Sequence, residues 1–358
     1  MIRVLHLRQG SGLYGADRAV IALAEATQAP YEAVVGSIQR PGQPDLLSEE
    51  ARRRGLAGVR FESARRFDLA CARSVGAWAR ENGVQLLHAH DFKALFVALF
   101  AGVPVVATFH GDTGSTLAVR VYELVARLLA NFTRGVAAVS RVLEARLRRW
   151  VRGAPVAFVP NAVPSWAPVS DAERVAARGR FGVDRFCIAV VGRLSPEKGH
   201  RVLFDALRGR RDVVALIAGD GPLREELERT ALFDARFLGF VEDTRAVFAA
   251  ADVVVLPSLT EGLPLVALEA MSLGRCLVAS AVGELPELLA DGAGVLVPPG
   301  DPRALSEAVD RVKNGEGCAA IFGARAAARA RLYDVAAMAG AYASLYGRAL
   351  SPMPSTSR

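Results

Sequence analysis

The stretch CIAVVGRLSPEKGH, residues 187–200, decides the fold of this chain. It opens with five apolar residues, turns at Gly192 and leads into a helical pattern. That order is typical of a parallel strand followed by its crossover helix. The same alternation of short β-branched runs and longer helical patterns also precedes it. Two rounds of alternation predict an α/β protein with two domains, each a parallel sheet covered by helices on both faces.

Short apolar runs before and after residue 185 are predicted to be strands. Residues 160–168 separate the two groups and contain three prolines, each of which removes a backbone donor and fixes φ. Ser170 and Glu173 follow with the spacing of a capping box, which begins a helix. The predicted strands are residues 2–7, 33–38, 86–89, 103–109, 136–139, 187–191, 213–218, 236–238, 253–256, 277–279 and 294–297.

This organisation predicts a first domain over residues 1–163 and a second over residues 164–330. A helix over residues 331–350 is expected to pack back toward the first domain, and residues 351–358 are expected to form a disordered tail. Two doubly wound domains joined in this way are expected to face each other across a cleft at the carboxyl ends of their strands. Sheets of this kind bind their ligands there.

Size and composition favour a cytoplasmic location. The chain has 358 residues, of which 52% are hydrophobic and 23% charged, as in an ordinary globular protein. Its four cysteines lie far apart and have no metal-ligand spacing, which favours reduced thiols. The longest uncharged run, residues 94–109, has 16 residues, whereas a membrane helix needs about 20.

The positive charge is concentrated in the first half of the chain. Residues 1–165 carry 21 Lys and Arg against 13 Asp and Glu, a net charge of +8, and residues 166–358 carry 23 against 24, a net charge of −1. The arginine clusters fit two interpretations, solvated helix faces or peripheral contact with an anionic membrane. Nucleic acid is disfavoured because no basic motif with interleaved aromatic residues is present. The clusters are Arg52–Arg54, Arg65–Arg66 and Arg146, Arg148, Arg149 and Arg152.

The segment Gly10–Gly15 matches the dinucleotide pattern GxGxxG between a strand and a helix. An NAD site also requires an acidic residue at the end of the second strand to hold the ribose. Taken from Tyr31 to Ile38, the second strand has Glu32 as its only acid, and that residue lies at the opposite end. The loop is therefore interpreted as a glycine-rich segment whose backbone, with Gly12, closes over a ligand.

Two segments of the second domain carry the strongest signals for phosphate binding. In the first, Arg193 and Lys198 follow a strand, so they are expected at the carboxyl edge of the sheet, where two cations can neutralise a diphosphate. In the second, Pro264 is placed to start a helix, which directs the N–H groups of Leu265 and Val266 at an anion. A solvated turn is the alternative for the first segment.

Two acidic residues accompany the second segment. Glu261 lies in the loop before the helix, and Glu269 lies on the helix, which is otherwise apolar. A buried carboxylate needs partners, and ligand hydroxyls would supply them. A structural ion pair is the alternative for Glu269.

These residues resemble family 4 of the retaining glycosyltransferases, which have the GT-B fold of two Rossmann-like domains. Glu261 and Glu269 form the E-x7-E pattern of that family, and residues 192–199 resemble its GRL-x-x-x-KG element. The resemblance covers roughly residues 1–345 and keeps the order of the family's motifs. The other matching segments are residues 217–223 (GDGPL turn), 237–241 (LGF/V segment), 87–90 (H-x-H) and 108–111 (TxH).

The resemblance implies a role for each matching residue. Arg193 and Lys198 would hold the donor diphosphate, Glu269 would bind the ribose, and Glu261 would face the donor sugar. His110 would lie over the reacting centre. Gly12 would close on the donor from the first domain. The nucleotide would further contact Gly219, Phe240, Val241, Leu265 and Val266.

The family further implies a nucleoside-diphosphate-sugar donor, with UDP favoured over GDP, and transfer with retention, without a metal or other cofactor. The acceptor would be a lipid-linked or growing glycan, reached from the cytoplasm or its membrane face. Departures from the family's motifs fall at Tyr14–Asp17, expected on the acceptor side, and at Glu284. His6, His88 and His90 can be structural. A nucleotide-sugar epimerase and a non-catalytic nucleotide-sugar-binding protein stay open as alternatives.

Overall fold

A computed structural model describes the chain except residues 11, 112–116, 165, 316–318 and 352–358, and except the side chains of residues 117, 118, 319 and 320. The predicted disordered tail thus lies almost entirely outside the described residues. The chain forms two compact units, Met1–Ala162 together with Val335–Arg358, and Val163–Asp334. It passes from one unit to the other twice, and Val163 and Asp334 pair as a parallel bridge at these two crossings.

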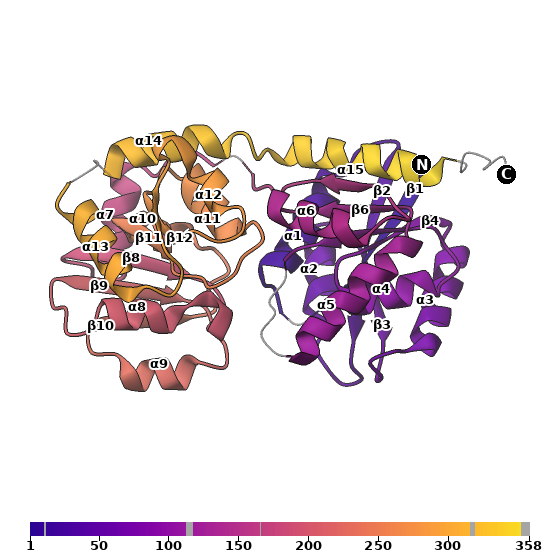
Figure 1. The fold of residues 1–358 in the computed structure, drawn as a ribbon, viewed down its shortest axis with the longest axis horizontal. Coiled ribbons are helices and arrows are strands. Elements are labelled where there is room, and N and C mark those ends of the chain that lie inside the picture. Colours follow the sequence, from indigo (N-terminus) through magenta and orange to yellow (C-terminus); the bar gives the residue numbers. More distant parts are fainter. Residues whose placement is uncertain (11, 112–116, 165, 316–318, 352–358) are drawn as a thin grey trace. The chain divides into compact units, whose positions relative to one another are not determined.

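The first unit is built on a seven-stranded parallel sheet with the order β3-β2-β1-β4-β5-β6-β7 (Figure 1). All five strands predicted here are confirmed, but β3 and β7 were not predicted. Both lie at sheet edges, where one side of the strand lacks a neighbour and the sequence need not be continuously apolar. The strands are β1 (Ile2–Gln9), β2 (Tyr31–Gln39), β3 (Ala57–Glu62), β4 (Val84–Ala89), β5 (Val105–Phe109), β6 (Gly135–Ala138) and β7 (Val156–Phe158).

Helices cover both faces of this sheet. Because side chains alternate along a strand, Leu5 and Leu7 of β1 pack with α3 and α4 on one face. Val4 of β1 packs with α15 on the other. The helices are α1 (Gly15–Ala26), α2 (Leu46–Arg53), α3 (Leu69–Glu81), α4 (Phe92–Leu99), α5 (Leu117–Leu129), α6 (Arg141–Trp150) and α15 (Val335–Leu350), with the 3₁₀ turn η1 (Ala130–Phe132).

The C-terminal helix α15 belongs to the first unit (Figure 1, in yellow). Its Tyr346 and Tyr342 are buried against the sheet. The hydroxyl of Tyr346 lies 2.8 Å from Nδ1 of His88, and that of Tyr342 lies 3.0 Å from the hydroxyl of Thr108. These hydrogen bonds satisfy buried polar groups on β4 and β5, so α15 completes the first unit.

The second unit is built on a six-stranded parallel sheet with the order β10-β9-β8-β11-β12-β13. The six strands predicted here are confirmed, with ends that differ by at most two residues. The strands are β8 (Phe186–Val191), β9 (Val213–Ala218), β10 (Asp234–Gly239), β11 (Val253–Leu256), β12 (Leu277–Ser280) and β13 (Val295–Val297).

The helices of this unit begin with α7, whose predicted capping box of Ser170 and Glu173 is confirmed. No helix in the described part of the chain, in either unit, is long and apolar enough to cross a membrane. The helices are α7 (Asp171–Arg180), α8 (His200–Ala206), α9 (Arg224–Thr230), α10 (Arg245–Ala250), α11 (Leu265–Ser272), α12 (Leu285–Leu288), α13 (Pro302–Lys313) and α14 (Ala319–Ala330), with the 3₁₀ turns η2 (Pro196–Lys198) and η3 (Ala290–Gly292).

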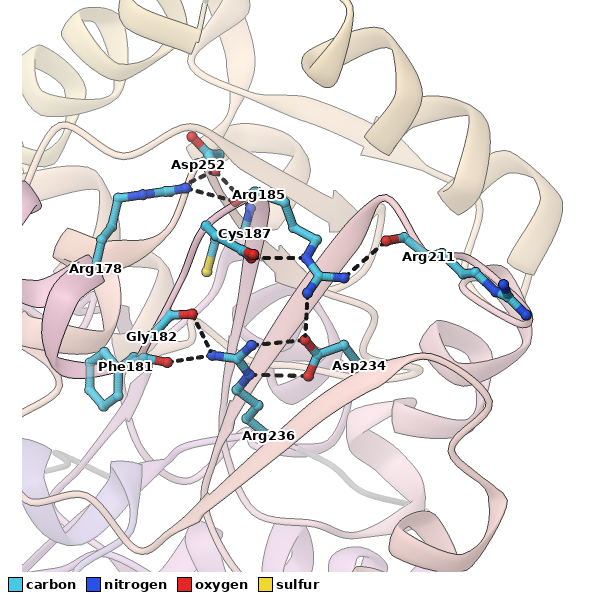
Figure 2. A network of polar contacts seen from close by, with 10 residues as sticks. Arg178, Phe181, Gly182, Arg185, Cys187, Arg211, Asp234, Arg236 and Asp252 are labelled. Atoms are coloured by element: carbon cyan, nitrogen blue, oxygen red, sulfur yellow. Dashed lines mark hydrogen bonds and ion pairs between the residues drawn. The ribbon is translucent and has the colours of Figure 1, made fainter.

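A network of arginines and carboxylates ties the amino ends of β8, β10 and β11 to α7 (Figure 2). Asp252 accepts hydrogen bonds from the Arg178 guanidinium at 3.1 Å, from the Cys187 N–H at 2.7 Å and from Arg174. Figure 2 shows Arg236 held between Asp234 and the carbonyl oxygen of Gly182, the latter at 3.0 Å. The network lies at the edge of the sheet opposite to the motif loops.

We predict that Asp252→Ala lowers the free energy of unfolding by about 1.5–3 kcal/mol, because two guanidinium groups and one backbone N–H lose their acceptor together. Denaturant titration followed by circular dichroism measures the change. Asp184→Ala is the control, because that carboxylate is mostly exposed and pairs only with Arg185, its neighbour in sequence, among the ion pairs that the structure describes. The control should unfold as the unchanged protein does, and equal losses in both variants would contradict the assignment.

Candidate functional site

The loops that carry the predicted motifs meet at the carboxyl edge of the second sheet. The N–H of Leu194, in the loop after β8, donates to the carbonyl oxygen of Asp220 after β9 at 3.0 Å. The Leu223 N–H returns a hydrogen bond to the Leu194 carbonyl oxygen at 2.9 Å. The Gly219 N–H donates to the carbonyl oxygen of Gly239, at the end of β10, at 2.7 Å. Three of the predicted segments therefore form one hydrogen-bonded surface.

Two glycines permit this close approach of the backbones. A Cβ at Gly219 would lie 1.9 Å from the carbonyl oxygen of Gly192, and φ of Gly219 is +146°. A Cβ at Gly199 would lie 1.9 Å from the carbonyl oxygen of Pro257, which links the loop after β8 to the loop after β11. Any other residue at either position would displace backbone, so these glycines fix the geometry of the loops.

Lys198 and Glu261 are in direct contact. The Lys198 ammonium lies 2.6 Å from Oε1 of Glu261, and the Ser258 hydroxyl donates to the same oxygen at 2.7 Å. The Glu261 side chain is 8% exposed and that of Lys198 is 30% exposed. Sequence reasoning assigned these two residues to different parts of the donor. The structure shows that each is the other's counter-ion, and it adds Ser258, which that reasoning did not select.

Arg193 lies on the same loop as Lys198 and is exposed. The N–H groups at the start of α11 lie after the loop of Glu261. Pro264, which precedes α11, provides no side-chain cap, while Leu265 is buried and Val266 is half-buried. Two cations and a helix amino end are thus borne by adjacent loops, the combination that favours a bound anion.

Glu269 is buried on α11 with 2% of its surface exposed. The hydroxyl of Thr244, which is also buried and precedes α10, lies 3.3 Å from its Oε2. Phe240, after β10, is 54% exposed, and Val241 beside it is half-buried. The short segment from Phe240 to Thr244 therefore connects an exposed aromatic face to a buried carboxylate. Sequence reasoning missed Thr244, although a hydroxyl residue before a helix was a signal for it.

In the first unit, three histidines form a chain of hydrogen bonds at the carboxyl edge of the sheet. His6 lies on β1, His90 follows β4 and His110 follows β5. Nδ1 of His6 lies 3.1 Å from Nε2 of His90, and Nδ1 of His90 lies 3.2 Å from Nε2 of His110. Gly12, between β1 and α1, has φ of +142°.

These rings are neutral at physiological pH. Burial lowers the pKa of His6 to about 3. Burial and the positive charge of Arg8 lower the pKa of His110 to about 3 as well. Burial and the neighbouring histidines hold the pKa of His90 well below its usual range. Each ring therefore exchanges hydrogen bonds as a neutral imidazole, with one protonated and one bare nitrogen.

Arg8 and Asp17 form a buried ion pair beside this chain. The Arg8 Nε donates to Oδ1 of Asp17 at 2.7 Å, and the Tyr14 N–H donates to the other carboxylate oxygen at 3.3 Å. Asp17 is fully buried. Its carboxylate is turned inward to hold Arg8 and to cap α1, and the expected acceptor side stays a prediction.

The buried rings of His6, His88 and His90 lie close enough to hold a metal ion, with one ligand atom of each within 4.8 Å of the others. Their nitrogens are used in another way. His88 bonds to Tyr346 and to Thr108, the latter at 2.7 Å, and His90 bonds to two histidines. In the part of the chain that the structure describes, Nε2 of His6 is the one nitrogen of this trio without a partner. The trio is organised as a hydrogen-bond network, and independence from metal stays a prediction.

Comparison with known proteins gives matches over both units. The family model described as Glycosyltransferase Family 4 matches residues 14–165, and that described as Glycosyl transferases group 1 matches residues 185–314. The phosphatidyl-myo-inositol mannosyltransferase of Mycobacterium leprae is 32% identical to this chain over 299 residues, which cover 78% of each protein. Matches to both halves, in this order, fit the division of the chain into two units.

Solved structures also resemble the whole chain. Anabaena Alr3699/HepE in complex with UDP and glucose has a TM-score of 0.85 at 24% identity and covers 97% of this chain and 100% of its own. Sucrose-phosphate synthase from Thermosynechococcus elongatus has a TM-score of 0.79 at 21% identity, with 97% and 99% covered. The likeness confirms the predicted fold class of two Rossmann-like domains.

We predict that Lys198→Ala weakens the binding of UDP by about 1.5–3 kcal/mol, the contribution of a charged hydrogen bond. Isothermal titration calorimetry measures it. Lys313→Ala is the matched control, since that ammonium pairs with Asp212 elsewhere in the second unit. Glu261→Gln removes the counter-ion of Lys198 and should leave UDP binding as strong or stronger. An unchanged affinity of Lys198→Ala for UDP would mean that the phosphate site lies elsewhere.

Proposed function

Since the chain belongs to the group 1, family 4 glycosyltransferases and has their GT-B fold, we propose that it is a retaining enzyme that uses a UDP-sugar donor. The observation that carries the proposal is the set of adjacent loops at the carboxyl edge of the second sheet. They carry Arg193, Lys198 and the amino end of α11, and the buried Glu269 lies further along that helix. Membership of a transferase family leaves no reason to pursue the non-catalytic alternative.

In this proposal the second unit holds the nucleotide. The exposed ring of Phe240 supplies a face on which a base can stack. Glu269 accepts hydrogen bonds from the ribose hydroxyls, and the Thr244 hydroxyl orients its carboxylate. Arg193, Lys198 and the first N–H groups of α11 take the diphosphate. UDP is favoured over GDP, and the HepE structure, which resembles this chain, contains UDP.

The transfer itself would take place on one face of the sugar. The bond from the anomeric carbon to the phosphate oxygen breaks, and a bond to the acceptor oxygen forms on the same side. The acceptor's proton passes to the departing phosphate oxygen. Arg193 and Lys198 stabilise the negative charge that develops there, which lowers the barrier to transfer. These side chains supply the positive charge that a metal ion would otherwise supply.

Lys198 must exchange partners during this cycle. In the structure its ammonium is neutralised by Glu261 at 2.6 Å. A diphosphate that reaches Lys198 would share or displace this carboxylate, which then becomes available to the hydroxyls of the donor sugar. The pair therefore keeps a cation inside a half-buried loop between turnovers without leaving its charge uncompensated.

We predict that the protein hydrolyses its donor slowly without an acceptor and releases the sugar first as the α anomer. The donors tested are UDP-glucose, UDP-N-acetylglucosamine and GDP-mannose, all in EDTA. Proton NMR, recorded before the released sugar mutarotates, identifies its anomer. The amount of UDP or GDP released from each donor shows which donor the protein uses. A β anomer would contradict retention, and loss of activity in EDTA that magnesium restores would contradict independence from metal. Epimerisation of a donor without transfer would favour the epimerase.

We also propose that the acceptor is lipid-linked or a growing polysaccharide and that the first unit touches an anionic membrane. The exposed side of α6 carries Arg146, Arg148 and Arg149 beside two exposed apolar side chains, Val142 and Trp150. Arginines next to apolar residues suit the headgroup region of a bilayer. The cluster of Arg52–Arg54 lacks this apolar neighbourhood in the proposal, and its Arg53 and Arg54 pair with Glu50, as Arg148 of α6 pairs with Glu144.

We predict that co-sedimentation with vesicles rises with the phosphatidylglycerol content of phosphatidylcholine vesicles and falls with added salt. Each arginine near an anionic surface contributes about 1 kcal/mol, and the attraction fades within a Debye length of about 8 Å at physiological salt. Replacing Arg146, Arg148 and Arg149 together by Glu should abolish it.

The matched control reverses three exposed arginines of the second unit and should sediment as the unchanged protein does. Both triple variants should bind UDP normally. If equal amounts of protein sediment with neutral and anionic vesicles, the arginines of α6 are better interpreted as a solvated helix face. The control residues are Arg208, Arg229 and Arg303.

A further inference from the structure

The two oxygens of the Glu261 carboxylate have different surroundings. Oε1 has two donors, the Lys198 ammonium at 2.6 Å and the Ser258 hydroxyl at 2.7 Å. Oε2 accepts no hydrogen bond from the residues that the structure describes, and it is not one of their buried polar atoms that lack a partner. Oε2 is therefore open to solvent, and the hydroxyl of a ligand can donate to it.

Ser258 is a fixed donor to this carboxylate. It comes directly after Pro257 at the end of β11 and is 2% exposed. A hydroxyl carries one proton and a carboxylate beside an ammonium accepts only, so the direction of this hydrogen bond has no alternative. The next residue is anchored as well, because the N–H of Leu259 donates to the carbonyl oxygen of Glu197 at 2.8 Å.

The loop after β12 holds the backbone of Glu261 from the other side. The N–H of Glu284 donates to the carbonyl oxygen of Gly262 at 2.9 Å. A Cβ at Gly283, whose φ is +58°, would lie 2.4 Å from the carbonyl oxygen of Glu261, so the two loops are in contact. With its backbone held on both sides, Glu261 keeps freedom mainly in its side-chain torsions, and the two donors to Oε1 restrain these.

These two donors are held to different degrees. Lys198 has a long side chain that is 30% exposed, and in the proposed function it exchanges Glu261 for the diphosphate. The Ser258 hydroxyl is joined to the backbone through a single carbon and is buried. When Lys198 turns to another partner, Ser258 is the donor that stays on Oε1.

We propose that Ser258 is a positioning residue, which holds Oε1 of Glu261 while Lys198 turns to the diphosphate, so that Oε2 stays directed toward a hydroxyl of the donor sugar. The inference rests on the proposed function, in which Glu261 becomes available to that sugar. It assigns one oxygen of the carboxylate to the protein and the other to the substrate. Without Ser258, a carboxylate released by Lys198 would rotate, and ordering it again would cost side-chain entropy in each cycle.

The first test compares the affinity for the donor with that for its nucleoside diphosphate, which lacks the sugar. The donor is whichever of UDP-glucose, UDP-N-acetylglucosamine and GDP-mannose the unchanged protein hydrolyses, and calorimetry without acceptor measures both affinities. We expect Ser258→Ala to bind the donor about tenfold more weakly and the nucleoside diphosphate within about twofold of the unchanged protein, because a single hydrogen bond to a charged group is lost at the sugar. Equal weakening of both ligands, or of neither, would overturn the proposal.

Two matched variants accompany Ser258→Ala. Ser258→Thr keeps the hydroxyl and should retain most of the affinity for the donor. Ser272→Ala removes another buried hydroxyl of the same unit, one that donates to the main-chain carbonyl oxygen of Glu269 at 2.8 Å, and should bind the donor as the unchanged protein does. A loss in Ser272→Ala as large as that in Ser258→Ala would mean that any buried hydroxyl has this effect, and the proposal would be wrong.

The second test is a double-mutant cycle that asks whether Ser258 acts through Glu261. Glu261→Ala should weaken donor binding and leave the nucleoside diphosphate bound. In the Glu261→Ala background, Ser258→Ala should cause less than about a twofold further loss of donor affinity, since no carboxylate remains to be held. The same loss in both backgrounds would overturn the proposal. The cycle does not depend on whether the methyl group added by Ser258→Thr fits.

The outcomes separate this inference from the proposed function. If the unchanged protein hydrolyses none of the three donors, the proposed function is wrong and the inference fails with it. If the protein hydrolyses a donor that Glu261→Ala binds as tightly as the unchanged protein, the transfer activity stands and the inference fails, because Glu261 does not contact the sugar. If Glu261→Ala is impaired and Ser258→Ala is not, only the role of Ser258 is wrong.

Discussion

The site of the second unit depends on the close approach of backbones between neighbouring loops at the carboxyl edge of its sheet. Gly192 and Gly219 bring the loops after β8 and β9 into contact, and Gly199 brings the loop after β8 against that after β11. Hydrogen bonds between main-chain groups then fix their spacing. The side chains of Lys198 and Glu261 can meet at 2.6 Å only because these loops are held together. The close packing of these backbones thus supports a pair of opposite charges.

The polar groups near the centre of the two sheets are neutralised in different ways. In the second unit charged groups are balanced in pairs, both at the Lys198–Glu261 contact and in the network around Asp252 at the opposite end of the sheet. In the first unit the central polar groups are neutral rings in contact with one another, with Arg8 paired to Asp17 and Asp91 beside them. Neutral groups can be buried deeply without counter-ions, which explains why histidines occupy central strands there.

Local chemistry made much of the fold and of the candidate site predictable from the sequence. Glycines and prolines at strand ends, and the restart of the strand pattern near residue 187, located eleven strands and the motif loops. The strands β3 and β7 were not predicted because edge strands need no continuous apolar run. Contacts between residues far apart in sequence were likewise out of reach. The Ser258 and Lys198 contacts of Glu261, the Thr244 contact of Glu269 and the chain of histidines depend on tertiary packing, which spacing along the chain does not reveal.

The placement of α15 has a consequence for how the protein is made. The first unit is discontinuous, since its last helix is synthesised only after all of the second unit. Until Tyr342 and Tyr346 emerge from the ribosome, the buried polar atoms of Thr108 and His88 lack their partners. The second unit, whose chain is continuous, can therefore close first during translation, while the part of the first sheet that α15 covers is still exposed. A nascent chain of this protein would expose that part of the sheet to chaperones until α15 docks.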